Sequence, residues 1–189
     1  PDCQDYLEVY ERAGLVTDRS VFGHCIHLSD SECRRLAEAG SVIAHCPTSN
    51  LFLGSGLFDM QQANRVGMQT VLATDVGAGT SFSLLRTMGE AYKVQQLNGY
   101  PMSVFESLYK CTLGAAKALH LDDEIGCFGK GRKADFIVID YAVTPSQQVR
   151  MDYLKHHEKW TLENKLFGLQ TIGDDRNILA TYIVGRRMK

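Results

Sequence analysis

Short apolar runs alternate with segments of helical periodicity between residues 20 and 119. The runs at residues 21–25, 41–45 and 69–75 have the length and composition of buried strands. Helical segments separate them, which is typical of βα units, in which a crossover helix joins two parallel strands. We therefore predict three parallel strands with two crossover connections.

Capping and turn residues mark where the helices of this region begin and end. Ser29 and Glu32 have the spacing of a capping box, and Gly40 follows the helix that they begin. Residues 47–56, rich in Pro, Ser, Asn and Gly, are predicted to be a loop, and helical spacing resumes at residues 57–66.

Two longer helical segments follow the third predicted strand. They cover residues 82–97 and residues 104–119, and Ser103 with Glu106 has the spacing of a second capping box. Each segment is predicted to be one helix.

The pattern changes to glycine-punctuated β-structure after residue 120. The predicted β-segments are residues 125–128, 134–140 and 178–184, the last turning at Gly185. They indicate a separate small β-module. The polar stretch at residues 141–177 contains one predicted helix, around residues 160–167, and the pattern does not place it further.

Composition narrows the classes of partner. The chain has 189 residues, 44% hydrophobic and 22% charged, which is ordinary for a globular protein. Its 20 Lys and Arg against 22 Asp and Glu give a net charge of −2, too balanced to favour nucleic acid or an anionic membrane as partner. Six cysteines without a C-x-x-C pair, and no 18-residue apolar run or secretory segment, favour a reducing cytoplasm.

Polar side chains occur at the ends of all three predicted parallel strands. His24, His45 and Asp75 hold equivalent positions there, where parallel βα folds place their active sites. Imidazole and carboxylate groups are also ligands that zinc accepts, so the three residues are candidates for one pocket. The alternative is structural, with hydrogen-bonded histidines and an aspartate that caps a helix or turn.

Other catalytic motifs are absent or incomplete. Neither Gly54 with Gly56 nor Gly77 with Gly79 has the third glycine of a dinucleotide-binding fingerprint. Cys25 adjoins His24, and Cys46 adjoins His45, but neighbouring strand residues point to opposite faces. If the histidines face a pocket, we expect both cysteines to face the helices. There is no G-x-S-x-G elbow of a serine hydrolase.

Three of these segments together resemble a known family. The sequences VFGH at residues 21–24, IAHCPTSN at residues 43–50 and ATDVGAG at residues 73–79 resemble the last three barrel strands of the amidohydrolase superfamily, in its nucleobase- and triazine-deaminating branch. Residues 124–136 resemble the segment in which such enzymes return to a small β-domain. Residues 173–178, GDDRNI, are similar to guanine deaminases in particular.

The resemblance implies an α/β fold that is only part of a larger one. Residues 1–122 would form the C-terminal portion, strands six to eight with their helices, of a TIM-type (β/α)8 barrel. Residues 123–189 would return to a small β-sandwich domain, with a partly helical polar stretch at residues 145–175. A complete barrel needs about 250 residues, so the 189 residues here are expected to be a piece of a longer chain.

The resemblance also implies roles for the candidate residues. Asp75 matches a ligand of a single zinc ion and could accept the proton of the attacking water. His24 matches a catalytic residue that assists this water and contacts the substrate, and His45 is expected to shape the pocket. The implied reaction is hydrolytic deamination of guanine to xanthine and ammonia, a step of guanine catabolism.

The other ligands expected for that family are missing from the sequence. No H-x-H pair occurs among the six histidines, and no H-x-x-E motif follows a strand. We therefore expect the isolated chain neither to bind zinc tightly nor to turn over guanine.

Two alternatives remain open at this point. One is another deaminase or hydrolase of the same superfamily, acting on an adenosine-like or triazine substrate. The other is a non-catalytic α/β binding module in which His24 and Asp75 are structural. The exposed sheet edges of a half-barrel predict association with a partner chain, most simply as a homodimer.

Overall fold

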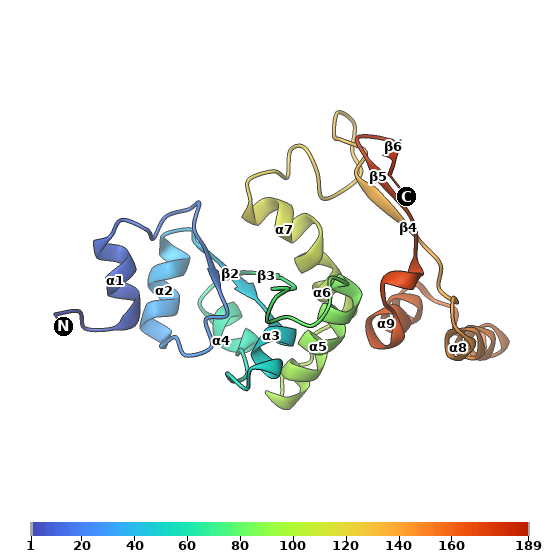
Figure 1. The fold of residues 1–189 in the computed structure, drawn as a ribbon, viewed down its shortest axis with the longest axis horizontal. Coiled ribbons are helices and arrows are strands. Elements are labelled where there is room, and N and C mark those ends of the chain that lie inside the picture. Colours follow the sequence, from blue (N-terminus) through green and yellow to red (C-terminus); the bar gives the residue numbers. More distant parts are fainter. Residues whose placement is uncertain (1, 189) are drawn as a thin grey trace.

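The computed structural model describes residues 2–188 and contains two separate three-stranded sheets. The strands are β1 (Val21–Gly23), β2 (Val42–His45), β3 (Gln69–Leu72), β4 (Phe136–Ile139), β5 (Ile178–Ile183) and β6 (Arg186–Arg187). The helices are α1 (Tyr6–Arg12), α2 (Asp30–Glu38), α3 (Pro47–Phe52), α4 (Met60–Arg65), α5 (Leu84–Leu97), α6 (Val104–Cys111), α7 (Leu113–Ala118), α8 (Pro145–His156) and α9 (Leu162–Ile172), with a 3-10 helix η1 (Asp175–Asn177). The molecule is elongated, with α1 and α2 at one end, the first sheet in the middle and α8 at the other end (Figure 1).

The first sheet is parallel, in the order β1–β2–β3, and both of its connections contain helices. Val21 pairs with Val42, and Val42 pairs with Gln69 on the other side. The predicted three parallel strands with two crossovers are therefore confirmed.

The two faces of this sheet are covered differently. On one face, Ile43 and Leu72 belong to a large apolar cluster with side chains from α1, α2, α4, α5 and α6. On the other face, Val42, Ala44 and Val71 belong to a small cluster that includes Ala118 of α7. Successive residues of each strand therefore face a thick helical layer and a thin one in turn.

The first predicted capping box is present and the second is half formed. Ser29 and Glu32 exchange both bonds of the box at the start of α2. Ser103 accepts from the Glu106 amide, but the Glu106 carboxylate bonds to the Tyr100 hydroxyl and not back to the cap.

Two predictions about the helical region are wrong. Residues 47–56 are not all loop, because α3 forms with Pro47 at its first turn, where proline fits a helix, and ends before Gly54, whose φ is +64°. Residues 104–119 form two helices, because Thr112 adopts φ −128° and ψ −107° between α6 and α7. The turn brings Gly114 against the Tyr109 carbonyl, where an added Cβ would lie 2.7 Å from the oxygen.

The strand predicted at residues 125–128 does not form, although the next two predicted strands do. Gly126 adopts φ +92° and lies so close to α7 that an added Cβ would be 2.6 Å from the Ala116 side chain. The segment packs on α7 and pairs with no strand of the described residues 2–188. β4 and β5 pair in antiparallel register, with Ile137 opposite Thr181, and β6 follows Gly185 on the other edge of β5.

The polar stretch before β5 contains α8 and α9, of which the sequence predicts only the second. Thr144 and Thr161 cap these helices by accepting from backbone amides. α9 packs on α5, where Gly89 permits the approach, since an added Cβ would lie 2.5 Å from the Gln170 carbonyl oxygen. The division of the chain at residues 122 and 123 stays a prediction.

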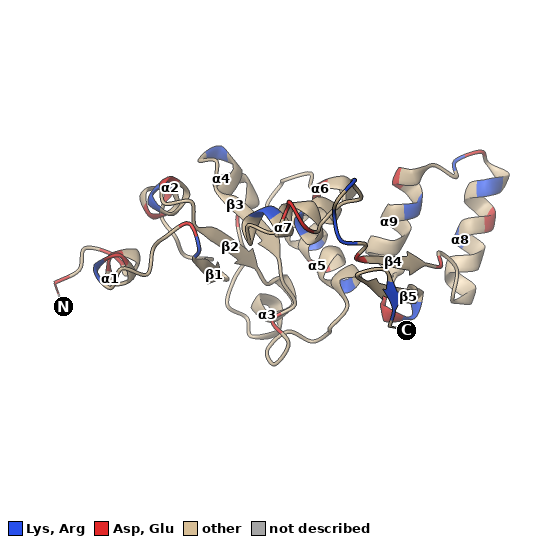
Figure 2. Cartoon of the chain, turned by 90° about the horizontal axis from the view of Figure 1, so that it is seen from above, with Lys and Arg blue, Asp and Glu red and all other residues tan. Residues whose placement is uncertain are grey.

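Charge is dispersed over the molecule, with acidic and basic residues on helices at both of its ends (Figure 2). Among residues 2–188, no helix is both long enough and apolar enough to cross a bilayer.

Candidate active site

His24 and Asp75 lie just beyond the carboxyl ends of two strands and share an unusual backbone conformation. The His24 amide continues the β1–β2 ladder by donating to the Ala44 carbonyl at 3.0 Å. His24 has φ +67° and Asp75 has φ +48°, in the left-handed region that few residues other than glycine adopt. Such strain is typical of functional positions, because the surrounding structure must hold it in place.

A tight glycine turn follows Asp75 and fixes its backbone. The Gly79 amide donates to the Asp75 carbonyl at 2.5 Å. A Cβ at residue 79 would lie 1.7 Å from the Thr74 carbonyl oxygen, so only glycine fits. The second glycine of the ATDVGAG segment therefore holds the turn that presents the Asp75 carboxylate.

The structure brings together His24 and Asp75, two of the three residues singled out by the sequence, and adds Cys46. His24 Nε2 lies 3.7 Å from Asp75 Oδ2. One ligand atom from each of His24, Cys46 and Asp75 lies within 4.8 Å of the other two. Nitrogen, sulfur and oxygen donors of these types are the ones that zinc accepts, so the residues present fit a zinc ion.

The expectation that Cys46 faces the helices is wrong. Cys46 lies one residue beyond β2 and belongs to the same sheet face as Val42 and Ala44, which is the face of His24 and Asp75. The expectation assumed that His45 faces the pocket. His45 instead faces the large apolar cluster, and because neighbouring strand residues alternate, Cys46 faces the pocket side. Burial, and then the Asp75 carboxylate, raise the pKa of the Cys46 thiol, so it is a poor nucleophile.

Cys25, in contrast, faces the helices as expected. It packs against the large apolar cluster, and burial raises the pKa of its thiol to about 12. Neither cysteine beside a histidine is thus activated as a Cys–His nucleophile would need.

His45 lies on the other side of the sheet from Asp75. Its ring stacks on Phe58, with centroids 4.8 Å apart, and the residue is fully buried. Neither ring nitrogen has a hydrogen-bond partner among residues 2–188. Burial, and then the charge of Lys110, lower the pKa of His45 to about 3, so its ring is neutral at pH 7. The grouping of His45 with His24 and Asp75 in one pocket is therefore wrong.

Asn50 is a contact of the site to which the sequence analysis gave no role. Its Oδ1 lies 2.8 Å from His24 Nδ1. Asn50 stands in the IAHCPTSN segment, and α3 turns back over the end of β2 to bring it to His24. The family resemblance of the IAHCPTSN segment could have indicated Asn50, but it gave no function to the individual residues of that segment.

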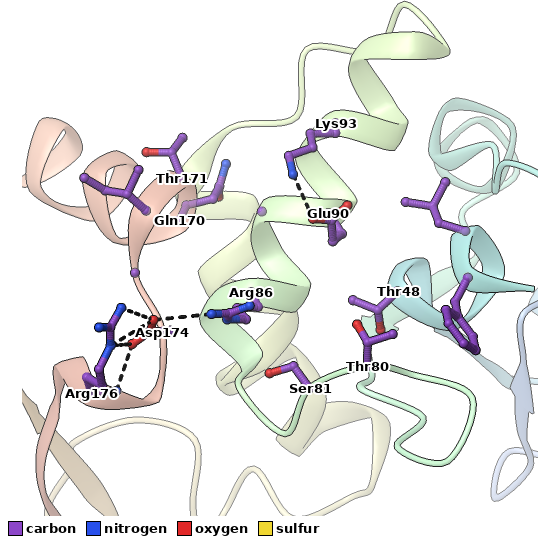
Figure 3. A pocket seen from close by; sticks show the side chains of 15 residues that line it. Thr48, Thr80, Ser81, Arg86, Glu90, Lys93, Gln170, Thr171, Asp174 and Arg176 are labelled. Carbon is purple, nitrogen blue, oxygen red and sulfur yellow. Dashed lines mark hydrogen bonds and ion pairs between the residues drawn. The ribbon is translucent and has the colours of Figure 1, made fainter. Parts of the chain in front are cut away.

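A polar cavity of about 640 Å³ lies elsewhere, between α3, α5 and the end of α9. None of His24, Cys46 and Asp75 lines it. Figure 3 shows Arg86 and Arg176 on either side of the Asp174 carboxylate, and Lys93 beside Glu90. Its charged side chains are thus largely paired with one another.

The GDDRNI segment forms a buried polar junction. The Asp174 carboxylate accepts from Arg176 at 2.7 Å and from Arg86 at 3.4 Å, and the Arg176 contact is the main cause that holds its pKa well below the usual range. Asn177 is fully buried and bonds to the Asp140 carbonyl and to the Gln147 side chain. In this chain the segment therefore joins α5, α8 and the second sheet.

Comparisons with known proteins identify the family of the chain. Residues 2–188 match the amidohydrolase family, and the chain belongs to that family. Over 186 residues, 98% of the chain, it is 50% identical to guanine deaminase of Escherichia coli K12, of which it covers 41%. The chain thus spans about two fifths of the length of this curated relative.

Solved structures give the same relationship. E. coli guanine deaminase superposes with a TM-score of 0.94 at 49% identity, covering 100% of this chain and 43% of that one. Guanine deaminase of C. acetobutylicum, solved with guanine in its active site, gives 0.80 at 30% identity over 98% of this chain and 43% of that one. An adenosine deaminase of Xanthomonas campestris with bound zinc gives 0.79 at 25% identity over 96% and 39%. The fold is α/β and is part of the TIM-barrel fold of these relatives, as predicted.

Proposed function

We propose that this chain is part of a zinc-dependent guanine deaminase and contributes His24 and Asp75 to its active site. The observation that carries the proposal is the meeting of His24 and Asp75, 3.7 Å apart, at the strand ends of a chain 50% identical to a guanine deaminase. The numbering of β1, β2 and β3 as barrel strands six, seven and eight is part of this proposal.

Asp75 would hold the zinc ion together with ligands from residues outside these 189. Its carboxylate is more than one third exposed, at the carboxyl edge of the sheet, where a ligand from another segment can approach. A bound zinc ion supplies Lewis acidity and lowers the pKa of water from 15.7 to about 7.

His24 and Asp75 would act on the water that attacks guanine. His24 would accept a hydrogen bond from this water as it attacks guanine C2, and it would also contact the base. The Asp75 carboxylate would accept the proton that the water loses. Guanine and water then give xanthine and ammonia, a step in purine catabolism.

The first test separates the chain from the longer protein. We expect the purified 189-residue chain to release no ammonia from guanine above a zinc-free blank, because the other zinc ligands are missing. The longer protein encoded by the same reading frame is expected to carry H-x-H and H-x-x-E at strand ends and to convert guanine to xanthine. A longer protein that leaves guanine unchanged, or an active 189-residue chain, contradicts the proposal.

The second test concerns the two residues. In the longer protein, His24→Gln and Asp75→Asn should each lower kcat by about 10²–10⁴-fold, the usual contribution of a positioned acid or base. The matched control is His156→Gln, since His156 is exposed on α8 and should be dispensable. A control that loses as much activity as His24→Gln would remove the assignment.

The runner-up is deamination of an adenosine-like or triazine substrate by the same site. The identity of 25% to the adenosine deaminase, against 49% to the guanine deaminase structure, favours guanine. A panel of guanine, adenosine and an aminotriazine, assayed by ammonia release, decides between them. A non-catalytic binding module would release ammonia from none of the three.

We further propose that the longer protein is a cytoplasmic homodimer. All six cysteines are free thiols in the structure, which suits a reducing compartment. Sedimentation of the longer protein gives its oligomeric state, and a monomer would contradict the second part of the proposal.

A further inference from the structure

Asn50 holds the only hydrogen bond of the His24 ring among residues 2–188. Its Oδ1 lies 2.8 Å from Nδ1 of the ring. The other ring nitrogen, Nε2, lies 3.7 Å from Asp75 Oδ2, which is too far for a hydrogen bond. The His24 side chain is 45% exposed, so packing alone does not fix the orientation of the ring. The Asn50 contact is therefore the main restraint on the imidazole.

Asn50 itself is firmly held. The residue is 2% exposed. Its backbone amide donates to the Cys46 carbonyl at 3.0 Å, and its carbonyl accepts from the Ser55 amide at 2.9 Å. Both bonds belong to the short helix α3 and the turn that ends it, so the amide side chain is presented to His24 from a fixed backbone.

The chemistry of this contact selects one form of the neutral ring. The contact joins His24 Nδ1 to Asn50 Oδ1, and an amide oxygen can only accept, so the hydrogen bond forms when His24 Nδ1 carries the proton. In a neutral imidazole, the other nitrogen then has a free lone pair. That nitrogen, Nε2, is the one on the side of Asp75.

We propose that Asn50 is a positioning residue that keeps neutral His24 in its Nδ1–H tautomer and leaves Nε2 free to accept a hydrogen bond from the attacking water. The effect on catalysis rests on the proposed deaminase function, but the tautomer of His24 can be measured without an activity assay. The opposite tautomer, with the proton on Nε2, could only donate at that atom.

Nitrogen NMR of the 189-residue chain tests the tautomer directly. In ¹⁵N-labelled chain at neutral to alkaline pH, the His24 signals, assigned by their loss in His24→Gln, should show a protonated Nδ1 and an unprotonated Nε2. Asn50→Asp keeps an acceptor oxygen and should keep this pattern. Asn50→Leu removes the acceptor at similar volume and should shift the ring towards the Nε2–H form.

Ser49→Ala is the matched control, because Ser49 is fully buried in the same helix and its hydroxyl has no partner among residues 2–188. The control should leave both His24 signals unchanged. A native chain with the proton on Nε2, or Asn50→Leu with the native pattern, overturns the proposal. If Asn50→Leu does not fold, the native tautomer and its retention in Asn50→Asp still decide.

The kinetic consequence is read in the longer protein. Asn50→Leu should lower kcat on guanine by about 10–100-fold, as for other residues that orient a group at a metal site, with KM changed less than kcat. Asn50→Asp should recover most of the loss, and Ser49→Ala should lose little. If the longer protein deaminates none of the tested substrates, the proposed function fails. The NMR pattern decides separately whether Asn50 restrains His24.

Discussion

The imidazole of His45 stacks on the ring of Phe58, with centroids 4.8 Å apart and an interplanar angle of 29°. The pair lies inside the helical layer, and the buried His45 ring has its pKa lowered to about 3 by burial and then by the charge of Lys110. A histidine held neutral in the folded state makes stability depend on pH, and this gives the first prediction.

Acid should destabilise the chain through His45. Below the ordinary histidine pKa of about 6.5, the unfolded state binds a proton at this residue and the folded state does not, until the pH approaches 3. Stability from this group is therefore complete above about pH 6.5 and is lost as the pH falls, by up to about 1.4 kcal/mol per pH unit. Urea unfolding of the native chain and of His45→Leu, between pH 7 and 5, measures the difference.

The Leu variant should lack this part of the pH dependence and unfold at pH 7 within about 1.5 kcal/mol of the native chain, since the ring has no hydrogen bond to lose. His156→Leu, at an exposed position on α8, is the control and should keep the native pH dependence. Equal slopes for the native chain and His45→Leu would mean that His45 is not held neutral.

Periodicity predicted the βα region because its local and tertiary signals agree. The strands around Ile43 and Val71 are short, apolar and bounded by turn residues, and the parallel order follows from their crossover helices. Where local and tertiary preferences conflict, prediction failed. Gly126 packs on α7 where an apolar run suggested a strand, and Thr112 breaks a segment with continuous helical periodicity.

The candidate site was predicted in part for a similar reason. His24 and Asp75 follow strand ends, and the parallel topology makes such residues converge. His45 occupies the matching position in sequence, but it lies within β2 while His24 and Asp75 lie beyond their strands in left-handed conformations. The sequence pattern does not encode those two φ angles. The side chains of His24, Cys46 and Asp75 meet, and Cys46 stands in the place expected for His45.

Gly79→Ala should disrupt the turn that presents Asp75. The added Cβ would lie 1.7 Å from the Thr74 carbonyl oxygen, so the backbone of the turn must move. We expect a loss of about 2–4 kcal/mol in the free energy of unfolding, a range typical of strong steric and backbone effects. Amide NMR shifts of the chain should change over residues 74–79.

Gly54→Ala is the matched control, because Gly54 has φ +64° with nothing within 4 Å of an added Cβ. It should lose only about 1–2 kcal/mol, for the left-handed backbone. If Gly79→Ala is no more destabilising than Gly54→Ala, the close approach to Thr74 does not hold the turn.

The cysteines should react with iodoacetamide in a definite order. Cys127 is exposed and should be alkylated first. Burial raises the pKa of Cys25 and of Cys111 to about 12, and Cys46 is 4% exposed with its pKa also raised, so these three should react at least ~100-fold more slowly in the native chain.

Mass spectrometry of peptides from the native and urea-unfolded chain measures these rates. Cys127→Ser should remove the fastest-labelled peptide and leave the slow rates as they are. Rapid native labelling of Cys46 would contradict a buried, protonated thiol beside Asp75.

Asn177→Asp should destabilise the junction between the second sheet and α8. Asn177 is fully buried, and its Nδ2 donates to the Asp140 carbonyl at 2.7 Å and to Gln147 Oε1 at 3.2 Å. Aspartate has the same shape but replaces this donor with an oxygen that faces two acceptors and carries an unpaired buried charge. The expected loss in the free energy of unfolding at pH 7 is about 3–5 kcal/mol.

The comparison that isolates this effect is Asn64→Asp, because Asn64 is exposed and its amide donates only to the Tyr100 hydroxyl among residues 2–188. The control should change stability by less than about 1 kcal/mol, as a surface substitution does. Both variants are measured by urea unfolding at pH 7 and again at pH 5, where partial protonation of a buried aspartate should reduce the loss for Asn177→Asp. If the two variants lose the same free energy of unfolding, the hydrogen bonds of the Asn177 side chain do not hold Asp140 to α8.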